Sequence, residues 1–171
     1  MMIKSYHVEF FTATILDWKH LLDEEFKSII INALRWLVQE KRCKIYGFVI
    51  MPNHIHLLWK IADGFERANV QGTLLSFTAH EFKKSLKTDG QMHRNHLVNL
   101  SDRSFQFWQR GYVVKECWSE WFLEEKLEYI HYNPLQSHWN LSDLPENYYW
   151  SSASFYENGK SPFEFITHYK E

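Results

Sequence analysis

Two strand-like runs joined by a two-residue turn constrain the fold most strongly. Residues 43–51 and 54–61 are rich in β-branched and aromatic side chains, and Pro52-Asn53 stands between them. Proline fixes φ and asparagine forms local side-chain hydrogen bonds, so the pair suits a tight turn. The pattern predicts a β-hairpin around which the other elements are ordered.

Amphipathic helices are predicted on both sides of this hairpin. Residues 23–39 place apolar side chains at helical spacing, with Asp23 positioned to cap the first turn. In residues 69–87, apolar side chains also recur at helical spacing, and lysines lie on the opposite, polar side of the predicted helix. The polar residues 88–103 then predict a loop.

Two further strands and a third helix complete the order. Residues 5–13 predict a first strand, and residues 105–117 regain strand character with a break at Gly111. Ser119 is placed to cap a helix that Pro134 ends. Strand-helix-strand-strand-helix-strand is the ferredoxin-like order, so we expect an α+β fold, an antiparallel sheet with helices on one face followed by a C-terminal helix.

The composition fits a single globular domain spanning residues 1–171. The chain is 45% hydrophobic and 18% aromatic, which suffices for a core over about residues 1–134, followed by an aromatic tail over about 135–171. Cys43 and Cys117 form no Cys-x-x-Cys pair, which favours a reducing cytoplasm. No signal peptide or apolar run of about 18 residues predicts export or a membrane span.

The charge is unevenly distributed along the chain. A net charge of -2 argues against binding nucleic acid by bulk electrostatics alone. Residues 77–115, however, hold seven Lys or Arg against three Asp or Glu, whereas residues 116–171 hold three against ten. This basic middle fits a nucleic-acid partner, and solvated faces without such a role give the same pattern.

His54 and His56 are the first residues that suggest chemistry. Positions i and i+2 of a strand share a face and lie about 6.6 Å apart, so two imidazoles can converge on one metal ion while Ile55 points into the core. Two ordinary histidines beside a hairpin give the same pattern. Histidine-triad hydrolases need a third histidine where this chain has Leu58, and phosphoesterases with paired His-x-Thr motifs are excluded because no such pair is present.

Tyr129 and Asn133 are expected side by side, one helical turn apart. A phenol can attack phosphorus, and an amide oxygen can complete a metal site begun by two imidazoles. A packed tyrosine with its hydroxyl in water, and an asparagine that ends the helix before Pro134, fit the spacing equally well. The chain has nine tyrosines, so spacing alone does not single out Tyr129.

Two longer motifs carry a resemblance. YGFVIMPNHIHLLWK, residues 46–60, and LEYIHYNPLQ, residues 127–136, resemble the REP-associated tyrosine transposases, which are HUH single-strand transposases. The first contains Met-Pro-Asn-His-hydrophobic-His-Leu and the second Tyr-Ile-x-x-Asn-Pro. Weaker likenesses are SFTAHEFKK, FWQRGYVVKE and YYWSSASFY, while residues 135–139 depart from the family's usual Arg-Ala-Gly-like turn.

The resemblance implies cleavage and strand transfer of single-stranded DNA, at hairpin-associated sequences, through a covalent 5′-phosphotyrosine. It implies that Tyr129 is the nucleophile and that His54, His56 and Asn133 bind a divalent metal, Mg²⁺ or Mn²⁺. Imidazole ligands favour Mn²⁺. Lys126, one turn before Tyr129, is a candidate for stabilising the phenolate.

The expected partner is single-stranded or hairpin DNA, bound by a monomer or a homodimer. Basic side chains would track phosphates and tryptophans would stack on bases. The candidates are Lys83, Lys84, Lys87, Arg94, Arg103, Arg110 and Lys115 for phosphates, and Trp108, Trp118 or Trp121 for bases. Packing in the core is the alternative for each tryptophan and the commoner role of this residue type. Two alternatives remain open, namely a non-catalytic hairpin-binding protein and a small metal-dependent phosphoesterase that activates water.

Overall fold

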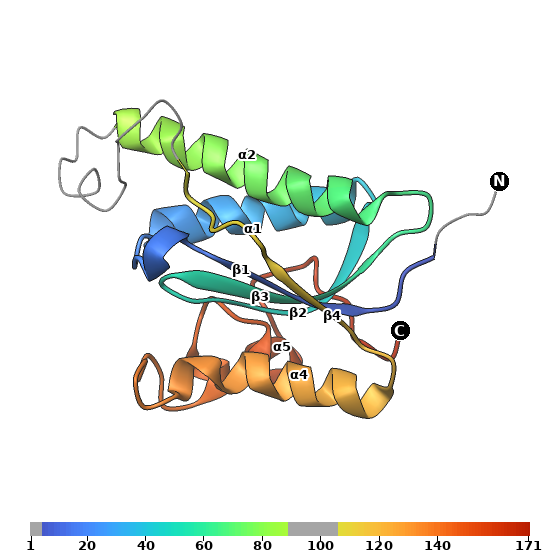
Figure 1. Ribbon diagram of the computed structural model, residues 1–171. Helices are drawn as coiled ribbons and strands as arrows, with labels where there is room; N and C mark the ends of the chain where they lie inside the picture. The colour runs from blue at the N-terminus through green and yellow to red at the C-terminus, as the bar shows by residue number, and fades with distance from the viewer. Residues whose placement is uncertain (1–4, 89–105) are drawn as a thin grey trace.

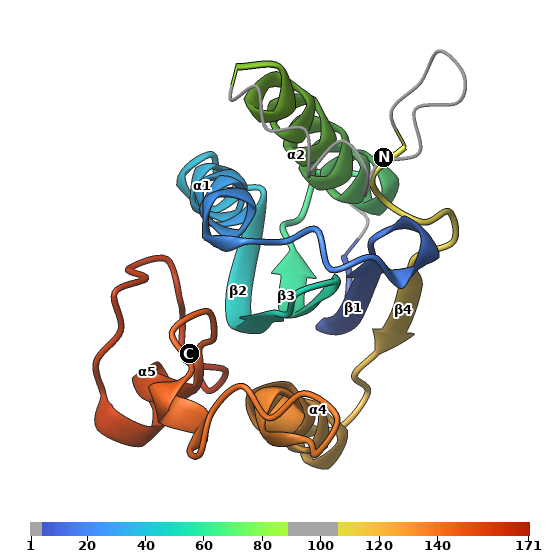
Figure 2. The same cartoon turned by 90° about the vertical axis from the view of Figure 1, so that its left-hand side faces the viewer.

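A four-stranded antiparallel sheet organises the computed structural model, which describes residues 5–88 and 106–171. The strands are β1 (Glu9–Thr14), β2 (Cys43–Ile50), β3 (His54–Ile61) and β4 (Val113–Glu116), in the order β2-β3-β1-β4. The main helices are α1 (Glu24–Gln39), α2 (Arg67–Thr88), α4 (Glu120–Tyr132) and α5 (Ala153–Asn158). The predicted ferredoxin-like α+β fold is confirmed, and α1 and α2 cover one face of the sheet while α4 and α5 lie on the other (Figures 1 and 2).

The central strand β3 is buried on both faces, and its alternation separates two cores. Ile55, Leu57 and Trp59 belong to the larger core between the sheet and the α1/α2 layer. Leu58 belongs to the smaller core under α4, and His56 lies on that same face because side chains alternate along a strand. The α4 side of the sheet therefore combines an apolar core with the two histidines.

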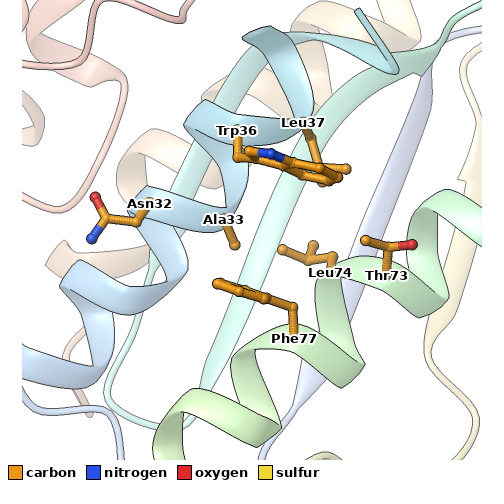
Figure 3. A pocket seen from close by; sticks show the side chains of 7 residues that line it. All are labelled: Asn32, Ala33, Trp36, Leu37, Thr73, Leu74 and Phe77. Carbon is orange, nitrogen blue, oxygen red and sulfur yellow. The ribbon is translucent and has the colours of Figure 1, made fainter. Parts of the chain in front are cut away.

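Helix α1 begins where the sequence predicts. The backbone N–H of Phe26 donates to Asp23 Oδ1 at 3.0 Å, which satisfies one of the free donors at the helix start. Phe26 then stacks on Phe82 of α2, with ring centroids 4.3 Å apart. An apolar pocket of about 480 Å³ opens between the two helices, beside the exposed rings of Trp36 and Phe77 (Figure 3).

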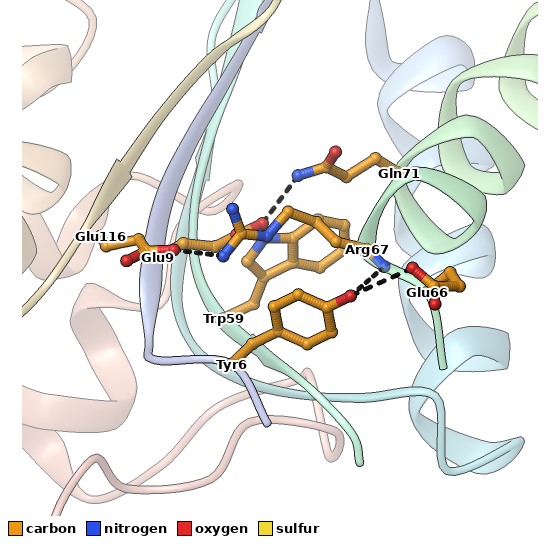
Figure 4. A network of polar contacts seen from close by, with 7 residues as sticks. All are labelled: Tyr6, Glu9, Trp59, Glu66, Arg67, Gln71 and Glu116. Carbon is orange, nitrogen blue, oxygen red and sulfur yellow. Dashed lines mark hydrogen bonds and ion pairs between the residues drawn. The ribbon is translucent and has the colours of Figure 1, made fainter. Parts of the chain in front are cut away.

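A buried ionic network ties α2 to the sheet (Figure 4). The carboxylate of Glu9 is fully buried and accepts hydrogen bonds from Trp59 Nε1 and Gln71 Nε2, each at 2.8 Å. Arg67 Nε lies 2.9 Å from the same carboxylate, and its Nη2 lies 2.5 Å from Glu116 on β4. Burial raises the pKa of Glu9, so these partners offset the cost of placing a charge in the interior.

The strand predicted over residues 105–117 was too long. Only Val113–Glu116 pairs with β1, and Trp108 forms a single bridge to Ile15. Phe107 and Trp108 instead pack against Phe82, because aromatic side chains can fill a core from irregular backbone as well as from a strand. Apart from Thr88, which ends α2, the predicted loop over 88–103 lies outside the described residues.

The aromatic tail closes the outer edge of β2. Ile166 forms a parallel bridge with Ile45, and Ser151 forms an antiparallel bridge with Val49. The hydroxyl of Tyr148 donates to the carbonyl of Ile50 at 2.8 Å. None of the helices in residues 5–88 and 106–171 has the length and apolar composition needed to cross a membrane.

Candidate functional site

Helix α4 is positioned by a cap, a close backbone approach and a buried histidine. Ser119 Oγ accepts from the N–H of Phe122 at 3.1 Å, as the sequence predicted. Leu127 packs directly over Gly47 of β2, where a Cβ would lie 2.6 Å from Leu127 Cδ1. His131 Nε2 lies 2.8 Å from Ser152 Oγ, which joins the helix to the tail. The helix is thus fixed against the sheet at both its core face and its C-terminal end.

This placement brings four predicted residues around one pocket of about 360 Å³. His54, His56, Tyr129 and Asn133 all line it. The ring centroids of His54 and His56 are 4.7 Å apart, and that of Tyr129 is 5.3 Å from that of His56. The remaining lining residues are Thr12, Thr14, Trp18, Gln136, His138 and Trp139. Tyr129 is 42% exposed, so its phenol is accessible to a substrate.

Asn53 fixes the tautomer of His54. The amide nitrogen of Asn53 donates to the carbonyl of Trp18 at 3.1 Å, which turns the amide oxygen toward His54 Nδ1 at 2.6 Å. An amide oxygen only accepts, so His54 Nδ1 carries the hydrogen and Nε2 keeps a free lone pair. That lone pair is the group a metal ion would use.

Thr12 orients His56 in a comparable way. Its hydroxyl lies 2.7 Å from His56 Nδ1, across the β1/β3 pairing. With the hydrogen on Nδ1, the lone pair of Nε2 is left for the pocket. Within residues 5–88 and 106–171, His56 Nε2 has no hydrogen-bond partner although it is buried.

Asn133 presents a second unpartnered acceptor. Its Oδ1 is buried and, among the described residues, accepts no hydrogen bond. A buried polar atom without a partner costs about 1–3 kcal/mol, and such atoms in native proteins call for an ion or water. His56 Nε2 and Asn133 Oδ1 both belong to residues lining the same pocket, which makes them the two candidate donors for a cation there.

Both imidazoles are held in the form that can ligate a metal. Burial lowers the pKa of His54 to about 4, and nearby His138 adds to the shift. Burial lowers the pKa of His56 to about 3, with a further contribution from His54. Both rings are therefore neutral near pH 7, and no proton competes for their lone pairs.

The donor set fits a divalent cation. In the part of the chain that the structure describes, no three His, Cys, Asp or Glu side chains cluster so that they could hold a metal ion. A metal at this pocket would therefore need a neutral oxygen donor beside the two imidazoles, and the unpartnered amide oxygen of Asn133 is such a donor. Two nitrogens and one oxygen suit Mn²⁺ or Mg²⁺ and leave positions for substrate oxygens.

Lys126 lies close to the tyrosine but already has an anionic partner. Its Nζ is 5.9 Å from the ring centroid of Tyr129 and 2.9 Å from Glu125 Oε1. The same ammonium lies over the ring of Phe122 at 4.9 Å. A paired ammonium stabilises a phenolate less than a free one does, so the activating role of Lys126 stays a prediction.

The predicted DNA-binding residues do not form one surface. Lys83, Lys84 and Lys87 lie on α2, on the opposite side of the sheet from Tyr129 (Figure 1). Lys84 Nζ is also 2.7 Å from Glu81. Sequence spacing put these lysines on the polar side of a helix but gave no information on which face of the sheet that helix covers. Arg94 and Arg103 lie outside the described residues.

Trp108 is wrong as a base-stacking candidate. It is buried, and its indole N–H donates to Thr78 Oγ1 at 2.9 Å, so it belongs to the α2 core. Trp118 and Trp121, by contrast, are 73% and 71% exposed near the start of α4. Lys115 is exposed opposite Phe10, on the face of the sheet that carries His56, whereas Arg110 lies in the exposed bend before β4.

The sequence did not reveal several residues that line the pocket or orient its histidines. Thr12 is separated from His56 by 44 positions, so its role depends on strand register rather than on any local pattern. Asn53 was assigned only to the turn. Its position next to His54 in the sequence was the one signal that it could contact this imidazole. Gln136, His138 and Trp139 come from the segment that departs from the family pattern, and here they line the pocket.

Comparison with known proteins places this geometry in a family. The family profile described as "Transposase IS200 like" matches residues 5–133. A REP-associated tyrosine transposase bound to a REP hairpin superposes with a TM-score of 0.66 at 16% identity, covering 98% of this chain and 89% of that one. A candidate transposase from Deinococcus radiodurans R1 gives a TM-score of 0.49 at 18% identity, covering 75% of this chain and 91% of that one. No curated protein sequence matches. Because the profile spans three-quarters of the sequence, from the first strand to Asn133, the chain belongs to the IS200-like transposase family.

Proposed function

We propose that this transposase cuts and rejoins single-stranded DNA through a covalent 5′-phosphotyrosine formed on Tyr129. The observation that carries the proposal is the convergence in one pocket of an accessible phenol, two neutral imidazoles and the unpartnered amide oxygen of Asn133. The two imidazoles come from β3, whereas the phenol and the amide come from α4 and the turn that follows it, more than 70 residues away in the sequence. Their meeting is the arrangement that phosphoryl transfer from DNA to a tyrosine requires.

His54, His56 and Asn133 would hold the divalent metal, Mg²⁺ or Mn²⁺. When bound there, the ion draws negative charge from a non-bridging oxygen of the scissile phosphate. Asn53 keeps His54 in the ligating tautomer, Thr12 orients the ring of His56 through Nδ1, and burial keeps both imidazoles unprotonated. The imidazole pair favours Mn²⁺ over Mg²⁺.

Tyr129 would attack phosphorus while the 3′ oxygen leaves. Its phenolic oxygen forms the new bond to phosphorus, the bond from phosphorus to the 3′ oxygen breaks, and that oxygen takes a proton to become a hydroxyl. The phenol must lose its own proton, and ionising a free phenol at pH 7 costs about 4 kcal/mol at 1.36 kcal/mol per pKa unit. Lys126 is the nearby cation for offsetting part of this cost. The phosphotyrosine preserves the bond energy for rejoining to another strand.

The single strand would run along β4 beside α4. Lys115 is exposed on the same face as His56, and it lies two residues before Cys117, where the chain turns toward α4. Trp118 and Trp121 present exposed rings at the start of that helix, where stacking is worth about 1–3 kcal/mol per base. A hairpin with a single-stranded flank is the proposed substrate, by analogy with the REP hairpin bound by the structurally similar transposase.

An adduct assay tests the proposal. Hairpin oligonucleotides with randomised single-stranded flanks are incubated with the protein and Mn²⁺, and denaturing gels reveal covalent protein–DNA species. We expect an adduct that Tyr129→Phe abolishes. Tyr132→Phe is the matched control, because Tyr132 is exposed on the same helix but does not line the pocket.

The same assay separates the two alternatives. A non-catalytic relative would bind the hairpin without forming an adduct in any variant. A phosphoesterase that activates water would keep its hydrolysis in Tyr129→Phe and lose it in His54→Ala. An adduct that persists in Tyr129→Phe would show that another residue is the nucleophile.

A further inference from the structure

Trp18 is an exposed tryptophan at the edge of the pocket. Its side chain is 61% exposed, yet it lines the same pocket as His54 and Tyr129. It comes from the short turn η1 (Leu16–Trp18), which connects β1 to α1. A large ring left in water beside a reactive pocket is available to a flat ligand.

The backbone holds Trp18 in an unfavourable conformation. Asp17 and Trp18 have φ values of 57° and 56°, and two consecutive residues with side chains rarely adopt this left-handed region. The turn is held at its start, because Ile15 N–H donates to the carbonyl of Asn53 at 2.8 Å and Leu16 N–H donates to that of Phe107 at 2.7 Å. Strain that the surroundings maintain in this way is concentrated at functional sites.

The turn is also coupled to the proposed metal ligands through Asn53. The Asn53 amide donates to the carbonyl of Trp18 at 3.1 Å and accepts from His54 Nδ1 at 2.6 Å. One side chain therefore sets the position of the tryptophan and the tautomer of the imidazole. The spacing between the indole and the reacting phosphate would be fixed by the protein rather than by the DNA.

The chemistry of the turn points to stacking and not to charge. Asp17 and Lys19 flank Trp18, so their formal charges cancel and the turn has no net attraction for phosphate. Trp139 lines the pocket from another segment and packs at 5.8 Å against His54. Trp18 and Trp139 thus give the pocket two indole rings, whose faces suit a nucleobase.

We propose that Trp18 stacks on the base next to the phosphate attacked by Tyr129, and so helps to determine where the strand is cut. The inference rests on the proposed function and adds to it the residue that positions the base. Every base has a π-face, so this contact would position the strand without selecting its sequence.

Fluorescence anisotropy with two probes tests the proposal. The probes are a short labelled thymidine oligonucleotide and an abasic oligonucleotide of the same length. We expect Trp18→Ala to weaken binding of the thymidine probe by about 5- to 150-fold, the equivalent of one lost base stack. Binding of the abasic probe should stay unchanged, and so should the salt dependence, because stacking releases no counterions.

Two further variants serve as controls. Trp18→Phe keeps an aromatic ring and should retain most of the affinity for the thymidine probe. Trp36→Ala removes an exposed tryptophan from the α1/α2 groove on the far side of the sheet and should change neither probe (Figure 3). Thermal melting verifies that each variant is folded.

If Trp18→Ala binds each probe as tightly as the unmodified protein does, the proposal is overturned. An equal loss of affinity for the thymidine probe and the abasic probe would also overturn it, because it would indicate a structural role for the indole. The result is independent of the adduct assay. A base-specific loss in Trp18→Ala, together with an adduct that survives in Tyr129→Phe, would retain the stacking role and reject Tyr129 as nucleophile.

Discussion

Thr12 of β1 pairs with His56 of β3, and its hydroxyl lies 2.7 Å from Nδ1 of that imidazole. Groups that orient a metal-ligating histidine typically change metal affinity by about 10–100-fold when they are removed. We expect Thr12→Val, which keeps the side-chain shape, to weaken Mn²⁺ binding by about this factor. Thr12→Ser retains the hydroxyl and should bind as the unmodified protein does. Isothermal titration with Mn²⁺ measures the affinity of both variants. Equal affinities of Thr12→Val and Thr12→Ser would show that the Thr12 hydroxyl does not orient His56 for metal binding.

Metal binding should stabilise the fold through three side chains. At a concentration of 100 times Kd, a metal that binds only the folded state adds about 2.7 kcal/mol to the free energy of unfolding. We expect Mn²⁺ to raise the melting temperature, and His56→Ala or Asn133→Ala to remove most of that rise. His80→Ala, an exposed histidine on α2, is the control. If Asn133→Ala still responds fully to Mn²⁺, then its amide is not a ligand.

Gly47 is required for the close approach of α4 to β2. An added Cβ would lie 2.6 Å from Leu127 Cδ1, so Gly47→Ala should displace the helix that carries Tyr129. We expect a loss of roughly 1–3 kcal/mol in stability, as for other overpacked sites, and a smaller yield of adduct. Denaturant titration measures the first quantity and the adduct gel the second.

Gly72 on α2 provides the comparison for Gly47. A Cβ at Gly72 meets no atom within 4 Å, so Gly72→Ala should stabilise the helix by about 0.5–1 kcal/mol. Adduct yield should be unaffected by this change. Similar effects of the two substitutions would mean that the contact with Leu127 does not position α4.

The stability should fall in mild acid because of buried histidines such as His131. Burial lowers the pKa of His131 from 6.5 to about 4, so the unfolded chain takes up a proton below pH 6.5 while the folded chain does not. The free energy of unfolding therefore decreases as the pH falls from 6.5 to about 4, by at most about 1.4 kcal/mol per pH unit from this residue. His131→Gln should show a shallower decline in denaturant titrations between pH 7 and pH 5. An unchanged slope would mean that folding does not lower the pKa of His131.

Local patterns in the sequence predicted the elements that bring the site together. The cap at Asp23, the cap at Ser119 and the turn at Pro52-Asn53 each depend on neighbouring residues, and the structure places all three as expected. The alternation of His54 and His56 likewise depends only on strand geometry. Tyr129 needed the family resemblance, because its spacing did not distinguish it from the other tyrosines.

Long-range packing decided what the sequence did not reveal. Trp108 has the exposure of a core residue because α2 covers it, and nothing adjacent in sequence indicates that contact. The lysines of α2 were assigned to DNA from local charge, which does not specify the face of the sheet. Trp18 was not among the sequence candidates because its place at the pocket depends on contacts of its turn with Asn53 and Phe107, which are remote in the chain.

The two-sided burial of β3 makes the protein intolerant of changes in strand length. A one-residue insertion or deletion that shifts the register of this strand would move each side chain to the opposite face of the sheet. Ile55 and Leu57 would then point toward α4, and the imidazoles would point into the apolar layer under α1 and α2. Folding and catalysis would then fail together, since the same alternation supports both. Variants of different length should therefore be accommodated in connecting segments, while this strand evolves by substitution alone.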